Sequence, residues 1–352
     1  MDLASKFFSV VAHFRVISPM SPYIGQSFGP ICYGQREAIA TAHQKAHMSE
    51  TLANLSLHDR TRMLAIGPVW GSAIQVHRDE VLAIYDPIVT QASDASVAVN
   101  RDIAYGDHDR QRLDIFYQTK DQKRPVIVFV HGGAFVRGSK SVSSNVYDNV
   151  LYWFAKRGFV GINIEYKLAP ENSYPMGGDD VAKAMDWVER NIESFGGSAD
   201  KVILLGHSAG ATHVCTYAID PMHGRKPSSS VRGLVLLSGR LRIDATEANP
   251  NAKGVRAYFG NDESMYEVQS PVSHAAKCSL PTMVAIAQYE NPLLDGYGIE
   301  FFSRLTSLPE SKKKFLQVNG HNHSSMVFHF NSGDDFLGLE IEKFVLNVLG
   351  GL

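Results

Sequence analysis

The chain has 352 residues, of which 44% are hydrophobic and 20% are charged, proportions that are ordinary for a soluble globular protein. Its formal net charge of −2 argues against a nucleic-acid partner, and no run of about 18 apolar residues predicts a membrane span. The three cysteines, Cys32, Cys215 and Cys278, are too few and too scattered for a disulfide framework or a metal site, so we expect a reduced, cytoplasmic setting.

Residues 1–95 are predicted to form a helical segment, because helical stretches with few breakers follow one another and strand alternation is lacking. We expect this segment to cap the main domain or to pack on its side, and it could serve as a homodimerisation arm. The predicted helices cover residues 36–55, 60–65 and 76–91.

From residue 96 to residue 352 the pattern changes, and apolar strand-like runs alternate with amphipathic helices. The predicted strands cover 98–105, 112–117, 125–130, 159–166, 202–205, 231–238, 282–287 and 314–318. The predicted helices cover 144–156, 178–195, 211–218, 298–305 and 335–349. This alternation predicts an α/β fold with a mostly parallel central sheet and helices on both faces. The long polar connection 240–280 is expected to form a pocket wall, because such connections are unusual unless they are functional.

Gly206, Ser208 and Gly210 form a Gly-x-Ser-x-Gly pattern between the predicted strand 202–205 and the predicted helix 211–218. A turn this tight strains the backbone of the serine, and small neighbours let other backbone approach it. The hydroxyl then lies in front of a helix N-terminus, which favours negative charge. In this context the pattern is typical of a nucleophile elbow, so Ser208 is the predicted nucleophile.

A serine nucleophile needs hydrogen-bond donors for the oxyanion that forms on its substrate. Gly132, Gly133 and Ala134 follow a predicted buried strand, where two glycines let the backbone turn its N–H groups toward a ligand. We predict that these three residues form an oxyanion loop and that the N–H of Ala209 supplies the other donor. His131 is expected to shape the loop.

The general base is expected near the C-terminus, after the last predicted strand. His321 and His323 compete there. His323 lies deeper in the loop, just before a small polar turn, and is the preferred base. His321 is interpreted as a neighbour of the site or as a surface residue.

The carboxylate that orients the base is expected after the penultimate strand. Glu290 comes directly off that strand, before an Asn-Pro turn, and is the preferred acid. Asp295 is the alternative, although it lies where a helix N-terminus favours a capping carboxylate.

Five motifs together make the resemblance to a known family specific. They are His131 to Phe135, Glu165 to Glu171, Tyr174-Pro175, Asp179-Asp180 with Trp187, and Gly206 to Gly210. The chain from about residue 97 to 350 resembles the hormone-sensitive-lipase-like and carboxylesterase branch of the α/β-hydrolase fold. The resemblance implies a serine esterase with a Ser–acid–His triad, an oxyanion hole, and no cofactor or metal.

The chain departs from this family at the acid position, where many members carry Asp-Pro-Leu. Here the sequence is Glu290-Asn291-Pro292-Leu293, and a shift by one residue makes Glu290 the acid. Ala134 replaces a glycine of the oxyanion loop, which keeps the backbone donor and adds a methyl group.

The sequence therefore predicts hydrolysis of a carboxylic ester of a small or medium-sized substrate, aromatic esters included, through an acyl-enzyme. An amidase, formamidase or carbamate hydrolase could use the same triad, and a non-catalytic ligand receptor is a further alternative.

Arg137 and Lys140, just past the oxyanion loop, could touch an acidic substrate but are interpreted as surface charge. Asp107-His108-Asp109 is interpreted as a solvated turn rather than a metal site.

Overall fold

The computed structural model describes residues 52–91, 94–120 and 122–350. Before the sheet it contains α3 (Leu57–Val69) and α4 (Ile74–Gln91). The helix predicted over 36–55 lies outside the described residues except for residues 52–55, which form a turn and bend instead.

An eight-stranded sheet runs through the described chain in the order β1-β2-β4-β3-β5-β6-β7-β8. The strands are β1 (Ala98–Ala104), β2 (Arg112–Tyr117), β3 (Arg124–Val130), β4 (Val160–Ile164), β5 (Gly197–His207), β6 (Val231–Leu237), β7 (Thr282–Tyr289) and β8 (Lys313–Asn322). The β1–β2 and β2–β4 pairs are antiparallel, and every other pair is parallel. The predicted mostly parallel sheet is therefore confirmed.

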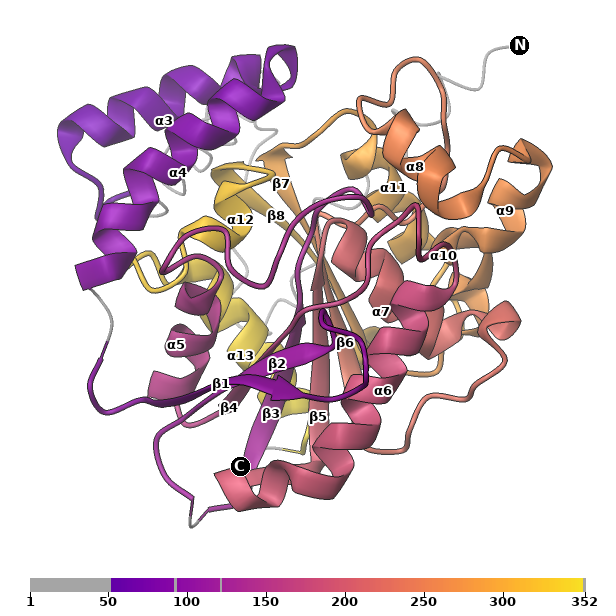
Figure 1. Cartoon of the computed structure of the whole chain (residues 1–352). Helices are drawn as coiled ribbons and strands as arrows, with labels where there is room; N and C mark the ends of the chain where they lie inside the picture. The colour runs from indigo at the N-terminus through magenta and orange to yellow at the C-terminus, as the bar shows by residue number, and fades with distance from the viewer. Residues whose placement is uncertain (1–51, 92–93, 121, 351–352) are drawn as a thin grey trace, which may run out of the picture. The chain divides into compact units, whose positions relative to one another are not determined.

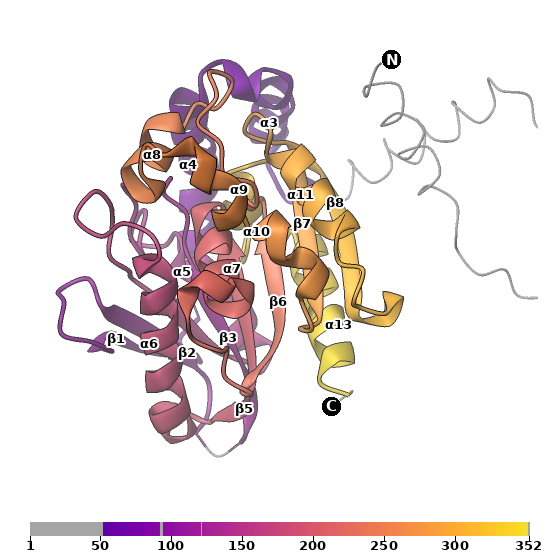
Figure 2. The same cartoon turned by 90° about the vertical axis from the view of Figure 1, so that its right-hand side faces the viewer.

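Helices cover both faces of this sheet, which explains why its central strands are apolar on both sides. The remaining α-helices of the described residues are α5 (Asp148–Lys156), α6 (Met176–Asn191), α7 (Ala209–Ile219), α8 (Ala252–Phe259), α9 (Tyr266–Gln269), α10 (Pro271–His274), α11 (Leu294–Ser303), α12 (Ser325–Phe328) and α13 (Phe336–Val348). Helices α6, α7 and α11 bury apolar residues with one face of the sheet, and α3, α4, α5 and α13 bury theirs with the other. Figure 2 shows α6 and α13 on opposite sides of the strands.

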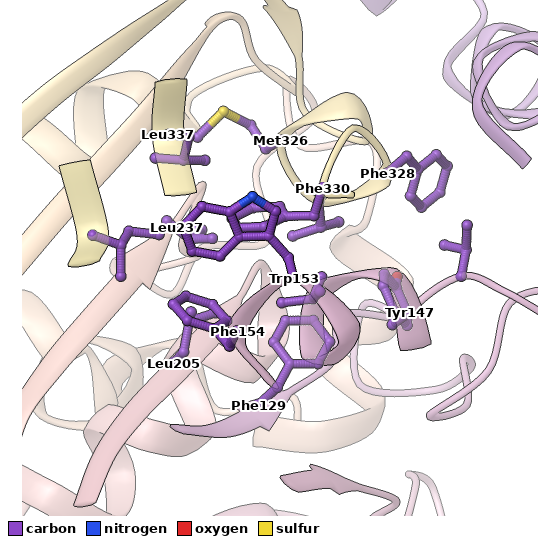
Figure 3. Close-up of a cluster of buried hydrophobic side chains, with 14 of the residues drawn as sticks. Phe129, Tyr147, Trp153, Phe154, Leu205, Leu237, Met326, Phe328, Phe330 and Leu337 are labelled. Atoms are coloured by element: carbon purple, nitrogen blue, oxygen red, sulfur yellow. The ribbon is translucent and has the colours of Figure 1, made fainter. Parts of the chain in front are cut away.

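Side chains alternate between the two faces of the sheet along each strand, so the core has two halves, one on each face. In β5, Ile203 and Leu205 point to the face of α5 and α13, whereas Val202 and Leu204 point to the face of α6 and α7. Figure 3 shows the first of these halves, with aromatic side chains of α5 and of the α12–α13 region meeting strand residues. The labelled side chains include Phe129, Trp153, Phe154, Leu205, Leu237, Met326 and Phe330.

The predicted elements differ from the observed ones mainly at their ends. α5 begins at Asp148, four residues later than predicted, and β5 is longer than its apolar run on both sides. The connection 240–280 is not irregular, since it holds α8, α9, α10 and two short 3₁₀ turns. Figure 1 shows α3 and α4 at the upper left and α8 and α9 at the upper right, above the strands of the sheet.

Within the described residues, no helix combines the length and the apolar character that crossing a lipid bilayer would require.

Candidate active site

Ser208 lies between the last residue of β5 and the first residue of α7, in a strained backbone conformation with φ 55° and ψ −120°. The two flanking glycines are required by close contacts. A Cβ on Gly206 would lie 2.5 Å from the Cα of Ala211, and one on Gly210 would lie 2.1 Å from the carbonyl oxygen of Val130. The chain therefore folds into the elbow that the Gly-x-Ser-x-Gly pattern predicts.

The three predicted triad residues lie in one hydrogen-bonded row. His323 Nε2 is 3.1 Å from Ser208 Oγ, and His323 Nδ1 is 2.8 Å from Glu290 Oε2. The other carboxylate oxygen of Glu290 accepts a hydrogen bond of 2.7 Å from the backbone N–H of Ala287. The carboxylate is thus fixed at both oxygens, and it faces the imidazole nitrogen that must carry a proton for the other nitrogen to accept one.

Strand register explains why Glu290 and His323 meet although 33 residues separate them. Tyr289, at the end of β7, pairs with Asn322, at the end of β8. Glu290 and His323 are the next residues of their strands, so parallel pairing places both side chains at one edge of the sheet. The N–H of His323 donates to the carbonyl oxygen of Tyr289 at 3.0 Å, which joins the two loops directly.

Asp295, the alternative acid, is exposed and lies in the first turn of α11. At that position a carboxylate is favoured by the helix dipole. Asn291, which occupies the position of the family's usual acid, accepts a hydrogen bond of 2.8 Å from the indole N–H of Trp70. The side chain that follows Glu290 therefore joins the acid loop to the end of α3.

His321, the alternative base, is fully buried away from Ser208. Its Nε2 lies 3.1 Å from Asp334 Oδ2, and its Nδ1 lies 3.0 Å from Ser325 Oγ. The interpretation of His321 as a possible surface residue is wrong, because these bonds hold it inside the loop that carries His323.

Among the described residues, one group has the composition of a metal site, His321, His329 and Asp334, with ligand atoms within 4.8 Å of one another. Both ring nitrogens of His321 already have partners there.

The predicted oxyanion residues surround Ser208. A Cβ on Gly132 would lie 2.9 Å from the Cβ of Ser208, so this position accepts no side chain. Gly133 and Ala134 have φ values of 150° and 50°, and the backbone of this loop turns sharply past the serine. Ala209 is the first residue of α7, where backbone N–H groups have no acceptor within the helix.

The oxyanion loop rests on His131, as expected, and on Glu165, Tyr166 and Arg110, whose role sequence reasoning missed. The buried His131 contacts Glu165 Oε1 through Nε2 at 3.1 Å, and Glu165 Oε2 accepts a bond of 3.0 Å from the N–H of Lys140. Tyr166 donates its hydroxyl to the carbonyl oxygen of His131 at 2.8 Å. Arg110 also pairs with the Glu165 carboxylate. The first two residues of the motif that begins at Glu165 therefore support the oxyanion loop.

The charged side chains that support the oxyanion loop pair with groups of opposite charge. Burial raises the pKa of the Glu165 carboxyl, but hydrogen bonding to His131 and Lys140 and the charge of Arg110 outweigh burial and leave the pKa below its usual value. Lys140 forms ion pairs with Asp114 at 2.7 Å and with Asp102 at 2.9 Å. The interpretation of Lys140 as surface charge is therefore wrong, since its side chain is largely buried.

His207 lies under the triad. Its Nε2 donates to the carbonyl oxygen of His323 at 3.0 Å, and the two rings lie 4.9 Å apart. Burial lowers the pKa of His207 well below its ordinary value, and the nearby His323 lowers it further. The ring is therefore neutral and supports the base without adding charge beside it.

A cavity of about 470 Å³ opens above Ser208. Its walls come from α4, the oxyanion loop, the connection 240–280 and the loops after β7 and β8. The lining residues are Ile74, Gln75, Arg78, Gly132, Gly133, Ala134, Arg137, Gly138, Val142, Tyr147, His207, Ser208, Pro250, Asn251, Asn291, His323 and Ser324. Helix α4 and the connection 240–280 thus both contribute to the pocket.

Comparisons with known proteins agree with this architecture. The BD-FAE family model matches residues 113–222. The chain is 26% identical over 242 residues to "Esterase LipC" of Mycobacterium tuberculosis (strain ATCC 25618 / H37Rv), which is 63% of this chain and 59% of that protein. It is 35% identical over 125 residues to "Probable isoprenylcysteine alpha-carbonyl methylesterase ICMEL2" of Arabidopsis thaliana, covering 35% of this chain and 28% of that protein.

Among solved structures, esterase B from Lactobacillus rhamnosis, inhibited by a tributyrin phosphonate, superimposes with a TM-score of 0.65 at 16% identity. The match covers 79% of this chain and 94% of that one. The chain spans less than two thirds of the length of the two curated relatives described above. The chain therefore has the α/β-hydrolase fold, and its matched segments are similar to those of esterases.

Proposed function

We propose that the protein is a serine hydrolase that cleaves a carboxylic ester of a small or medium-sized substrate through an acyl-enzyme. The observation that carries the proposal is the continuous row of hydrogen bonds from Ser208 through His323 to Glu290, at 3.1 and 2.8 Å, beside the oxyanion loop. The esterase names of the curated relatives support the reaction class.

In the proposed mechanism, Ser208 Oγ attacks the ester carbonyl carbon while His323 Nε2 takes the hydroxyl proton. The carbonyl electron pair moves to the oxygen, which the N–H groups of the Gly133–Ala134 loop and of Ala209 stabilise. When the intermediate collapses, the bond to the leaving alcohol breaks and His323 returns the proton to that alcohol. Water then attacks the acyl-enzyme in the same way: His323 takes its proton and returns it to Ser208 Oγ as the carboxylic acid leaves. Glu290 keeps the imidazole oriented and stabilises its charged form in both steps.

Hydrolysis of an amide or a carbamate is the second candidate, because the same row of residues could carry it. The two differ in the leaving group that His323 must protonate. Rates on a matched ester and anilide with the same acyl group separate them, and the proposal expects the ester to be the better substrate.

The replacement of Ser208 by alanine tests the proposal. In Ser208→Ala, we expect ester hydrolysis to fall by about 10⁴-fold or more, because the nucleophile is absent. A phosphonate should add once to the wild-type protein by intact mass and not to the variant. Ser303→Ala, which removes an exposed hydroxyl from α11, is the matched control and should retain both properties. A wild-type protein that hydrolyses no ester and takes up no phosphonate would favour a non-catalytic receptor.

The setting of the enzyme is also part of the proposal. We place it in the cytoplasm on the pattern of its cysteines, of which Cys215 and Cys278 are free and buried thiols. Residues 96–352 form the proposed catalytic domain, and residues 1–95 the proposed cap, a candidate arm for a homodimer. No nucleic-acid partner is proposed, given the formal net charge of −2.

A further inference from the structure

Two arginines line the cavity above Ser208. Arg78 comes from α4, and Arg137 follows the oxyanion loop. Within the described part of the chain, the cavity lining contains no aspartate or glutamate. The pocket therefore carries two permanent positive charges with no lining carboxylate to balance them.

Among the described residues, neither guanidinium has an ion pair shorter than 3.4 Å. Arg78 lies 3.4 Å from the carboxylate of Asp79, its exposed neighbour in sequence, and Arg137 donates to the amide oxygen of Asn251 at 3.2 Å. Elsewhere Arg101 pairs with two carboxylates, at 2.9 and 2.5 Å. Arg137 is exposed and the side chain of Arg78 keeps 31% of its surface exposed, so an anion that enters the cavity can reach both guanidinium groups.

Both arginines lie beside residues of the reaction centre. Burial raises the pKa of Tyr147, and the charge of Arg78 opposes that rise. Burial lowers the pKa of His207, and Arg78 adds to the decrease. Arg78 is therefore close enough to act on two residues that line the cavity. The backbone N–H of Arg137 donates to the carbonyl oxygen of Gly133 at 3.1 Å, which fixes this arginine to the oxyanion loop.

We propose that the pocket selects esters that carry a carboxylate besides the ester group, and that Arg78 and Arg137 bind this carboxylate. Guanidinium groups suit the task because their planar donors match a carboxylate and stay charged at every physiological pH. The inference rests on the proposed ester hydrolysis and adds the substrate class to it.

Matched substrate pairs test the proposal. For a carboxylate on the acyl side, mono-4-nitrophenyl glutarate is compared with 4-nitrophenyl 5-methylhexanoate, in which an isopropyl group replaces the carboxylate. For the alcohol side, 4-acetoxybenzoate is compared with 4-isopropylphenyl acetate. The quantity measured is the ratio of kcat/KM for the charged and the neutral ester. Dividing the ratio of a variant by that of the wild type cancels intrinsic reactivity and any general loss of activity.

In Arg78→Gln and Arg137→Gln, we expect this ratio to fall by about tenfold or more for at least one pair, as loss of a charge-assisted hydrogen bond predicts. Lysine at either position should restore part of the ratio, because the charge returns without the planar donors. The control is Arg232→Gln, which removes one positive charge from an exposed residue of β6, and it should leave the ratio unchanged.

The result that overturns the inference is an equal ratio in the wild type and in both pocket variants for both pairs. If the wild type hydrolyses the neutral esters and the ratio still does not respond, the substrate class is wrong and the esterase proposal stands. If the wild type hydrolyses none of the four esters and phosphonate does not label Ser208, the esterase proposal itself falls, and the inference falls with it.

Discussion

Glu290 is the residue at which this chain departs from the usual pattern of the esterase family that it resembles. β7 continues to Tyr289, so Glu290 is the first side chain beyond the strand and reaches His323 at 2.8 Å. Asn291, one position later, points its amide oxygen to Trp70 instead. A longer acidic side chain placed one residue earlier thus reaches the imidazole, and the neighbouring position becomes free for a structural contact.

This geometry predicts unequal effects of two neutralising substitutions. In Glu290→Gln, we expect kcat for a 4-nitrophenyl ester to fall by about 10³–10⁴-fold, because the amide no longer favours the required tautomer of His323 or stabilises its charged form. Asp295→Asn removes the same charge from the first turn of α11 and should stay within about twofold of the wild type. Steady-state kinetics measure both, and a large loss in Asp295→Asn with activity kept in Glu290→Gln would assign the acid to Asp295.

At the scale of elements, the ends of parallel strands decide where the site forms. Periodicity of apolar residues gives the strands, and motifs give the loops, so the order of nucleophile, acid and base and their place at one sheet edge could be predicted. The preference for Glu290 came from its place directly after a predicted strand, and that for His323 from its place deeper in the last loop, just before a small polar turn. The elbow and oxyanion motifs were read from the residues and their neighbouring elements, and they then carried the resemblance to a known family.

Contacts between distant residues could not be predicted. The bond from Trp70 to Asn291 spans 221 residues, and no local pattern marks it. The same holds for Glu165, whose carboxylate supports a loop that lies earlier in the chain. Helix starts were also missed, as at α5, where the N-cap Tyr147 makes no side-chain capping bond that the sequence could mark. Arg78 belongs to this class, since no spacing in the sequence brings it to the cavity above Ser208.

The support of the oxyanion loop leads to a prediction about an element rather than about a reacting group. In Glu165→Gln, we expect kcat to fall by about tenfold with KM within about twofold, because the loop loses its charged anchor and the oxyanion donors lose their alignment. Kinetics with a neutral 4-nitrophenyl ester separate the two constants. Glu342 lies on α13 and forms an ion pair with Arg157, at the end of α5, so Glu342→Gln is the control for loss of an ion pair. A rise in KM alone would show that the loop acts in substrate binding instead.

For the whole molecule, buried histidines link stability to pH. Burial lowers the pKa of His213 to about 3 and that of His329 to about 4, from an ordinary value of 6.5. The unfolded chain therefore binds protons that the folded chain does not between pH 6.5 and these lower values. Stability is fully present above about pH 6.5 and is lost as the pH falls below it.

The size of this loss can be checked by unfolding experiments. From pH 6.5 to pH 5, each of the two histidines should cost about 2 kcal/mol of the free energy of unfolding. Urea unfolding at several pH values gives the slope for the wild type and for His213→Leu. The slope reports how many more protons the unfolded chain binds than the folded chain, and we expect this number to be smaller by about one in the variant. Identical slopes in the two proteins would mean that His213 becomes protonated inside the folded chain.

Trp70 gives the molecule an optical property. Its ring is almost fully buried, at 1% exposure, and its N–H donates to an amide that lines the pocket. Indole emission responds to changes at its N–H and in the polarity around the ring. A molecule that enters the pocket and contacts Asn291 therefore changes the surroundings of a natural fluorophore, and binding can be followed by light without a chromogenic substrate.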